Sequence, residues 1–229
     1  MDKSIAIIGG SNLIHSSLVS ELKEERFRTP FGPVTAFCGD RIMLIQRHGS
    51  HNLPPHKINH KANLSAIKQR LIKRVIAINS VGSLKRDIEP GTFCLVTDFI
   101  SFYNIPTIDE NGRTHVTPML CPELSNKIRD CSDVDFREVV YWQTTGPRFE
   151  TPAEIRLMAA FADVVGMTLG SEATIAAELG LDYASICMVD NFANGIMREP
   201  LTFSAFDRMV RENQARMDAF LKEMCACLC

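Results

Sequence analysis

Short apolar runs recur along the chain, and most of them end in glycine, serine or asparagine. Runs of this length that stop at turn-forming residues are typical of buried strands whose ends meet polar loops. In chain order they read IAIIGGSN, MLIQRHG, VIAINSVGS, CLVTDFIS, VVYWQTTG, DVVGMT and YASICMVDN. The pattern therefore predicts a strand at each run.

Between several of these runs, apolar residues return at the three- and four-residue spacing of a helix. The predicted helices cover 61–72, 151–162, 171–179 and a long final segment capped by Ser204. The stretch Thr151–Glu154 is the clearest start, with Thr at the N-cap, Pro at the first helical position and Glu three residues after the cap.

Strands that alternate with helices predict an α/β fold. We expect one domain over residues 1–229, a three-layer sandwich whose mixed, largely parallel central sheet is flanked by helices. In such folds ligands gather at the carboxyl ends of the strands, so function should be sought there.

Composition narrows the class of protein. The chain has 229 residues, 45% of them hydrophobic and 23% charged, and a formal net charge of −2. Lysine and arginine are spread along the chain, which argues against a nucleic-acid partner. No apolar run reaches the length of a membrane span or of a signal peptide, so we expect no membrane partner and a cytoplasmic protein.

The eight cysteines fall into two groups. Those within apolar runs, such as Cys94 and Cys187, are expected to be small buried core residues. The tail CACLC, with Cys225, Cys227 and Cys229, favours a frayed end with free thiols, and a redox or disulfide role stays open. It has no histidine or fourth ligand beside it, so no metal site is predicted.

Polar residues at four strand ends form a candidate anion site. Gly9-Gly10-Ser11 follows the first run, Arg47-His48 the second, Ser80 lies in the third and Thr168 ends the sixth. Each alone is explained by a turn or a loop. Together they predict a small oxyanion held by hydroxyls, backbone amides and an arginine suited to bidentate contact. Because the chain has neither a GxxxxGK[ST] loop nor a carboxylate-rich metal site, the prediction is free phosphate.

The motifs also resemble a known family. IAIIGGSN, RHG, HKIN-x-x-AN, AINSVGSL, GPRFETPAEI, VVGMT and ASICMVDN stand in the order found in trimeric purine nucleoside phosphorylases, over about residues 4 to 221. The resemblance is strongest to the methylthioadenosine and methylthioinosine phosphorylase branch. It implies the nucleoside phosphorylase fold, a homotrimer or dimer of trimers, and no cofactor, with inorganic phosphate as co-substrate.

The resemblance also implies a role for particular residues. Phosphate-binding residues would be Ser11, Arg47, His48, Ser80 and Thr168. Met167 would contact the ribose, Phe149 would pack on the base, and Glu150 and Asn191 would hydrogen-bond the base. Asn191, Glu150 and His48 would be the catalytic group. The reaction is cleavage of the N-glycosidic bond by phosphate, in which Asn191 stabilises the departing base.

Hydrogen-bond chemistry then favours a 6-oxopurine. An ionised Glu150 only accepts and therefore matches an N1–H donor, while Asn191 donates to O6 and pairs with N7. In the adenine-cleaving branch the aligned positions carry a small residue and Asp. Asp190, just before Asn191, departs from the family pattern, and a shift of register by one residue would bring it to the base.

Two further features of the sequence bear on the 5′ substituent of the predicted substrate. Phe203 and Phe206 favour a methylthio group over a hydroxyl, although packing of the last helix explains them equally well. His115 matches a residue that approaches the 5′ end from a neighbouring subunit. The predicted substrate is S-methyl-5′-thioinosine, cleaved to hypoxanthine and 5-methylthioribose 1-phosphate. The alternatives are a general inosine/guanosine phosphorylase and a methylthioadenosine phosphorylase.

Two other classes of function compete with this prediction. A nucleoside hydrolase would turn over without phosphate, and a non-catalytic nucleoside-binding protein would release no base. The set of phosphate residues argues against both. Arg148 has no role in the implied mechanism, and we expect it to form a structural ion pair in its loop.

Overall fold

The computed structural model describes residues 4–10, 13, 16–103, 105–112, 115–198 and 202–229. Each of the seven apolar runs contributes a strand. These strands are β1 (Ile5–Gly9), β4 (Ile42–Gln46), β5 (Arg74–Ser83), β6 (Phe93–Ile100), β7 (Arg137–Gln143), β8 (Val164–Gly166) and β9 (Asp182–Phe192). Two more, β2 (Lys23–Thr29) and β3 (Gly32–Cys38), form an antiparallel hairpin.

The strands form one mixed sheet in the order β2-β3-β4-β1-β5-β8-β7-β6-β9, with an additional pairing of β9 to β5. This pairing closes part of the sheet into a ring of five strands, β5, β8, β7, β6 and β9. The rest of the sheet continues from β5 as an open sheet of four strands, β1, β4, β3 and β2. The pairs β1–β4, β1–β5 and β5–β9 are parallel. The carboxyl ends of these four strands therefore meet at one edge.

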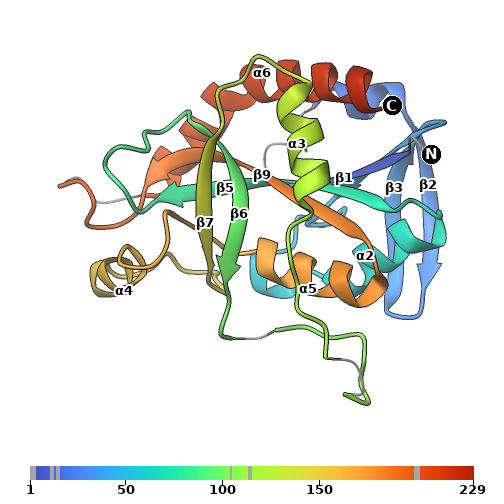
Figure 1. The fold of residues 1–229 in the computed structure, drawn as a ribbon, viewed down its shortest axis with the longest axis horizontal. Helices are drawn as coiled ribbons and strands as arrows, with labels where there is room; N and C mark the ends of the chain where they lie inside the picture. The colour runs from blue at the N-terminus through green and yellow to red at the C-terminus, as the bar shows by residue number, and fades with distance from the viewer. Residues whose placement is uncertain (1–3, 11–12, 14–15, 104, 113–114, 199–201) are drawn as a thin grey trace.

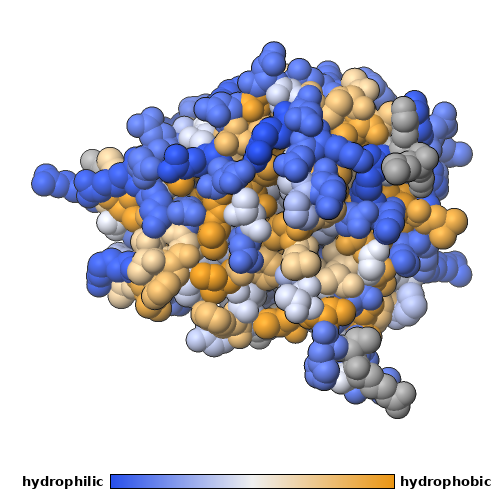
Figure 2. All heavy atoms as spheres, in the orientation of Figure 1, coloured by the Kyte–Doolittle hydropathy of each residue, from blue (hydrophilic) through white to orange (hydrophobic). Residues whose placement is uncertain are grey.

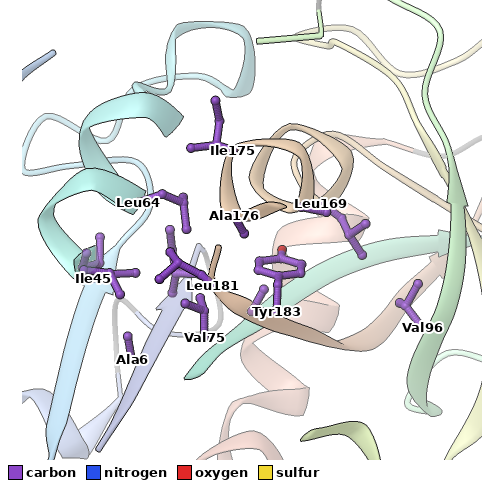
Figure 3. Close-up of a cluster of buried hydrophobic side chains, with 14 of the residues drawn as sticks. Ala6, Ile45, Leu64, Val75, Val96, Leu169, Ile175, Ala176, Leu181 and Tyr183 are labelled. Atoms are coloured by element: carbon purple, nitrogen blue, oxygen red, sulfur yellow. The ribbon is translucent and has the colours of Figure 1, made fainter. Parts of the chain in front are cut away.

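Helices cover the sheet on both faces (Figure 1). On one face lie α2 (His60–Gln69) and α5 (Leu169–Leu179), and on the other α3 (Pro122–Asp130) and α6 (Phe203–Leu228). Figure 3 shows Leu64 of α2 and Ile175 and Ala176 of α5 meeting strand side chains such as Tyr183. The expected α/β sandwich of three layers in a single domain is confirmed.

The remaining helix, α4 (Pro152–Met158), packs outside these layers on a smaller core. It begins as expected, with a capping box between Thr151 and Glu154 and Pro at the start. It ends earlier than the predicted 162. Likewise α5 begins at Leu169, two residues before the predicted start, because Thr168 occupies its N-cap position. The last helix begins at Phe203, so Ser204 lies within it.

The C-terminal tail is helical to Leu228, which contradicts the expectation of a frayed end. Met224 and Leu228 are buried against the sheet. Cys227 forms a disulfide with Cys131, the C-cap residue of α3, at a Cα–Cα distance of 5.6 Å. The disulfide therefore ties the ends of α3 and α6 together. None of the described helices is both long and apolar enough to cross a bilayer.

Candidate active site

Arg47 lies at the centre of the strand ends. Its backbone N–H donates to the carbonyl of Gly9, which joins the end of β4 to the end of β1. Its side chain is almost completely buried. Nε and Nη2 both donate to the carboxylate of Glu172, in the first turn of α5. A buried guanidinium requires such a partner, because an unpaired charge in the interior is costly.

Three strand-borne acceptors complete the environment of Arg47. Nη1 donates to the carbonyl of Ile78 at 3.1 Å, and Nη2 donates to the carbonyl of Ile8 at 3.2 Å and to Oδ1 of Asn79 at 2.9 Å. Nε and Nη2 are both engaged in these hydrogen bonds. Among the described contacts, Nη1 keeps one N–H group that can still donate to a ligand. A bidentate contact to phosphate, expected from the sequence, does not fit this arrangement, whereas a single contact through Nη1 does.

Glu172 is held ionised at the centre of this network. Burial acts to raise its pKa, but the charge of Arg47 and contact with His60 outweigh burial and lower the pKa to about 2. Tyr183 donates its hydroxyl to the same carboxylate at 2.9 Å. Sequence reasoning missed Glu172, although a carboxylate within the apolar stretch of α5 signals a buried charge partner.

Asn79 is a second residue that sequence reasoning missed. It is 1% exposed, and its Oδ1 is held by Arg47 while its Nδ2 has no hydrogen-bond partner among the described atoms. A buried donor without a partner is costly and rare, so this amide indicates a place for an acceptor. Its position directly before Ser80, in an otherwise apolar strand, is the signal that could have found it.

His48 and Arg47 both face Gly10. A Cβ atom on Gly10 would stand 2.8 Å from Nε2 of His48 and 3.4 Å from Nη1 of Arg47. Glycine therefore leaves a small space between the Gly9-Gly10 turn and these two nitrogens. Nδ1 of His48 lies 2.6 Å from the carbonyl of Leu53, and burial lowers the pKa of the ring. Ser11, the hydroxyl expected here, lies outside the described residues.

Ser80 and Asp190 form a hydrogen bond where β5 runs beside β9. The register of this pair shifts between Val81 and Gly82, which face Val189 and Asn191, so Asp190 is the extra residue of a β-bulge. Its carboxylate is completely buried and accepts from Ser80 and, at 3.0 Å, from Nδ2 of Asn213 on α6. Burial raises the pKa of Asp190 to about 6.

The bulge separates Asp190 from Asn191. Asp190 is engaged by Ser80 and Asn213 in the interior, whereas Asn191 is half-buried beside Gly82 and donates to the carbonyl of Phe192 at 2.9 Å. A residue larger than glycine at position 82 would crowd this amide, with a Cβ 3.1 Å from Nδ2.

Thr168 and Met167 stand at the end of β8. Thr168 is buried, donates its backbone N–H to the hydroxyl of Tyr141 at 3.2 Å, and makes no side-chain cap to α5. Met167 lies against Gly146, whose φ of +60° favours glycine, and a Cβ there would stand 2.6 Å from Sδ, so the Met167 side chain would have to move.

Glu150 is held from two sides. Thr144 donates to its Oε1 at 2.6 Å, and Asn194 donates to its backbone carbonyl at 2.9 Å. The residue is 8% exposed. The loop that carries Glu150 is fixed in turn by Arg148, which makes two hydrogen bonds to the carboxylate of Glu154. The expected structural ion pair of Arg148 is confirmed.

The three phenylalanines predicted around the substrate form a row. The rings of Phe149 and Phe206 are 6.1 Å apart in a T-shaped arrangement, and those of Phe206 and Phe203 are 6.0 Å apart. This row joins the GPRFE loop to the start of α6. His115 is not part of it: the residue is exposed, in the segment between β6 and α3.

A family model described as the phosphorylase superfamily matches residues 4–226. The chain belongs to this family.

Individual relatives agree with that placement. A probable 6-oxopurine nucleoside phosphorylase of Archaeoglobus fulgidus is 39% identical, with 91% of this chain and 90% of the relative aligned. A probable S-methyl-5′-thioinosine phosphorylase of Methanocaldococcus jannaschii is also 39% identical, over 93% and 88%. The solved methylthioadenosine phosphorylase of Schistosoma mansoni, in complex with adenine, superposes with a TM-score of 0.86 at 25% identity, over 97% and 91%.

Proposed function

We propose that this protein cleaves 6-oxopurine nucleosides with inorganic phosphate, and that S-methyl-5′-thioinosine is its substrate. The products are hypoxanthine and 5-methylthioribose 1-phosphate. The observation that carries the choice of base is the hydrogen bonding of the Glu150 carboxylate. Thr144 holds Oε1, and the described contacts leave Oε2 as an acceptor for the N1–H that a 6-oxopurine has and adenine lacks.

The anion site supplies the nucleophile. The unpartnered amide of Asn79 on β5 and the free donor of Arg47 after β4 lie toward the edge where the parallel strands end, and the hydroxyl of Thr168 is proposed to join them from β8, which pairs antiparallel with β5. A phosphate oxygen bonds to C1′ of the ribose as the C1′–N9 bond breaks, and the electron pair leaves with the purine. Fixing the phosphate beside an oxocarbenium-like C1′ lowers the barrier by orientation and charge.

Asn191 serves the departing base. Its side chain is half-buried and its Nδ2 is held by the carbonyl of Phe192, so the amide has a defined orientation. In the proposed complex it faces N7 and O6, where negative charge develops as the C1′–N9 bond breaks. Phe149 packs on the base, and Met167 on the ribose.

The apolar row of Phe149, Phe206 and Phe203 supports the methylthio group. A methylthio group can pack against such rings, whereas the rings offer a 5′-hydroxyl no hydrogen-bond partner. The general inosine/guanosine phosphorylase is the second candidate, supported by the Archaeoglobus fulgidus relative.

Steady-state assays of base release distinguish these functions. We expect kcat/KM for S-methyl-5′-thioinosine to exceed that for inosine, and base release to stop when phosphate is left out. A much higher kcat/KM for inosine would favour the general phosphorylase. Turnover without phosphate would indicate a hydrolase, and binding without base release a non-catalytic protein.

We also propose a homotrimer, or a dimer of trimers, acting in the cytoplasm. Large apolar side chains are exposed in the segment after β6 and on α4 and its end, namely Phe102, Tyr103, Met119, Leu157 and Phe161. In the view of Figure 2 the surface over α3 and α6 is mostly hydrophilic, and hydrophobic atoms gather below it. Light scattering should give three or six times the chain mass, and a monomer would contradict the proposal.

A further inference from the structure

Asp190 is a buried carboxylate that the proposed reaction does not use. It is completely buried and is the extra residue of the β9 bulge. Its two oxygens accept from two different elements, Oδ2 from the hydroxyl of Ser80 on β5 and Oδ1 from Nδ2 of Asn213 on α6. Because both oxygens are engaged, the side chain fixes the bulge against β5 and fixes α6 against the bulge.

The bulge determines the direction of the Asn191 side chain. Side chains alternate along a strand, so Val189 belongs to the core covered by α2 and α5, whereas Asp190 points to the opposite face, toward α6. Without a bulge, Asn191 would return to the face of Val189. In the ladder Val189 pairs with Val81, and the next residue of β5, Gly82, pairs with Asn191, because the bulge leaves Asp190 out. Asn191 therefore stays on the face of Asp190.

This direction brings Asn191 to the side of the sheet that meets the loop of Glu150. A Cβ on Gly82 would stand 3.1 Å from Nδ2 of Asn191 and 3.6 Å from Cβ of Ala193. Ala193 belongs to the small core on which α4 packs, and the next residue, Asn194, donates to the backbone carbonyl of Glu150 at 2.9 Å. The bulge thus directs the proposed donor to the leaving base toward the side of the proposed acceptor for its N1–H.

The second bond of Asp190 fixes how α6 lies on the sheet. Phe206 and Phe220 lie seven residues before and after Asn213, so the three side chains share one face of the helix at steps of about two turns. Phe220 is in the core, and Asn213 is 5% exposed. Rotation of α6 about its axis would break the 3.0 Å bond between Asn213 and Asp190. It would also move Phe206 from the ring of Phe149, 6.1 Å away.

We propose that Asp190 is a positioning residue for the nucleoside. Through the bulge it aims Asn191 at the base, and through Asn213 it holds Phe206 at the 5′ end. The proposal rests on the proposed function, because it takes Asn191 and Phe206 as contacts of the nucleoside. Asp190 itself touches neither the nucleoside nor phosphate.

The two bonds should have separable effects on the kinetics of base release from S-methyl-5′-thioinosine. Asn213→Ala frees α6 but leaves the bond between the bulge and Ser80. It should raise the KM for the nucleoside by about three- to tenfold, the effect of one aromatic contact, with kcat near the wild-type value. Asp190→Ala removes both bonds, so it should raise this KM and also lower kcat by about tenfold or more, because Asn191 is no longer aimed.

The KM for phosphate should change little in both variants. Of the proposed phosphate donors, Asn79 is bonded to Arg47 on the face of β5 that α2 and α5 cover, away from Asp190. Initial rates with each substrate varied in turn measure the three constants. Asp182→Asn, at the start of β9, and Glu212→Gln, exposed on α6, are the matched controls and should keep all three.

Two further variants distinguish positioning from a general structural role. Asp190→Asn can keep both bonds, since its Oδ1 accepts from Asn213 and its NH2 donates to the oxygen of Ser80, so it should keep kcat near the wild-type value. In an Asn191→Ala background, Asp190→Ala should cause no further loss of kcat, because the residue through which it acts is already gone.

Each outcome decides between the accounts. Wild-type kinetics in a folded Asp190→Ala variant would overturn the proposal, and so would a full tenfold loss of kcat in the Asn191→Ala background. If Asp190→Ala does not fold, Asn213→Ala decides, and an unchanged KM for the nucleoside overturns the proposal. If the wild type releases no base with phosphate present, the proposed function itself fails.

Discussion

The guanidinium of Arg47 is bonded to both carboxylate oxygens of Glu172, which joins the end of β4 to the first turn of α5. The same guanidinium reaches carbonyls of β1 and β5. The pair thus fixes the strand ends from which the proposed phosphate ligands are offered. These contacts hold the strand ends in place, and in the proposed complex the remaining donor on Nη1 contacts the anion.

Glu172→Gln should therefore destabilise the protein strongly. The substitution leaves the buried guanidinium of Arg47 without a countercharge, and loss of one partner of a buried ion pair costs about 3–5 kcal/mol. Urea unfolding at pH 7.5 measures the free energy of unfolding. Glu223→Gln, on the exposed side of α6, is the control and should change it by less than about 0.5 kcal/mol. Equal stability of the two variants would contradict the structural role of the pair.

Asp190 should make stability fall as the pH rises. Its pKa is about 6 in the folded protein against 3.8 for an exposed aspartate, so between these values the folded state keeps a proton that the unfolded state has lost. The stabilising contribution of the protonated Asp190 is fully present below about pH 4 and is lost as the pH rises to about 6. Asp190→Asn removes this decline and should be about 2–3 kcal/mol more stable at pH 7.5. Parallel pH profiles of the two proteins would show that Asp190 is not the cause.

The disulfide between Cys131 and Cys227 should stabilise the fold by about 2–4 kcal/mol, because it closes a loop with a sequence separation of 96. Cys227→Ser should lose this amount in urea unfolding, and reduced wild type should match the variant. Cys225→Ser removes a free thiol two residues away and serves as control. Wild type that is equally stable with and without a reducing agent would contradict a stabilising bond.

Asn191→Ala should lower kcat by about a hundredfold or more, the effect of removing one donor that stabilises developing charge. The KM for phosphate should change little, since the proposed phosphate contacts lie on other strand ends. Initial-rate kinetics with each substrate varied in turn measure both effects. An unchanged kcat would remove Asn191 from stabilisation of the leaving base.

Much of the fold could be predicted from the sequence because its central strands are buried on both faces. Such strands are continuous apolar runs, and all seven were found. The hairpin of β2 and β3 was missed for the opposite reason: β2 reads KEERFRT and leaves most of its side chains exposed or half-exposed, as a charged edge strand does. Helix α3 was missed because it is short and its N-cap is a cysteine without a side-chain cap.

The sequence predicted which residue types form the site, but it did not predict the contacts between them. The sequence indicated the strand ends, but it could not show that Arg47 pairs with Glu172, since 125 residues separate the two. The sequence left Asp190 and Asn191 as alternatives for the contact with the base. A β-bulge changes which face of the sheet the following side chains point to, and nothing in the spacing of apolar residues marks it. The pairing of Cys227 with Cys131 depends on the packing of α6 on the sheet, which spacing does not encode.

The choice of base is the central claim, and one ratio tests it most directly. This is kcat/KM for S-methyl-5′-thioinosine divided by kcat/KM for S-methyl-5′-thioadenosine, with phosphate in excess. In the wild type the ratio should be about a thousand or more, because adenine leaves the buried carboxylate of Glu150 facing a bare N1. In Glu150→Gln it should fall toward one, while Glu154→Gln, in the exposed pair with Arg148, should keep it. A wild-type ratio near or below one would contradict the account.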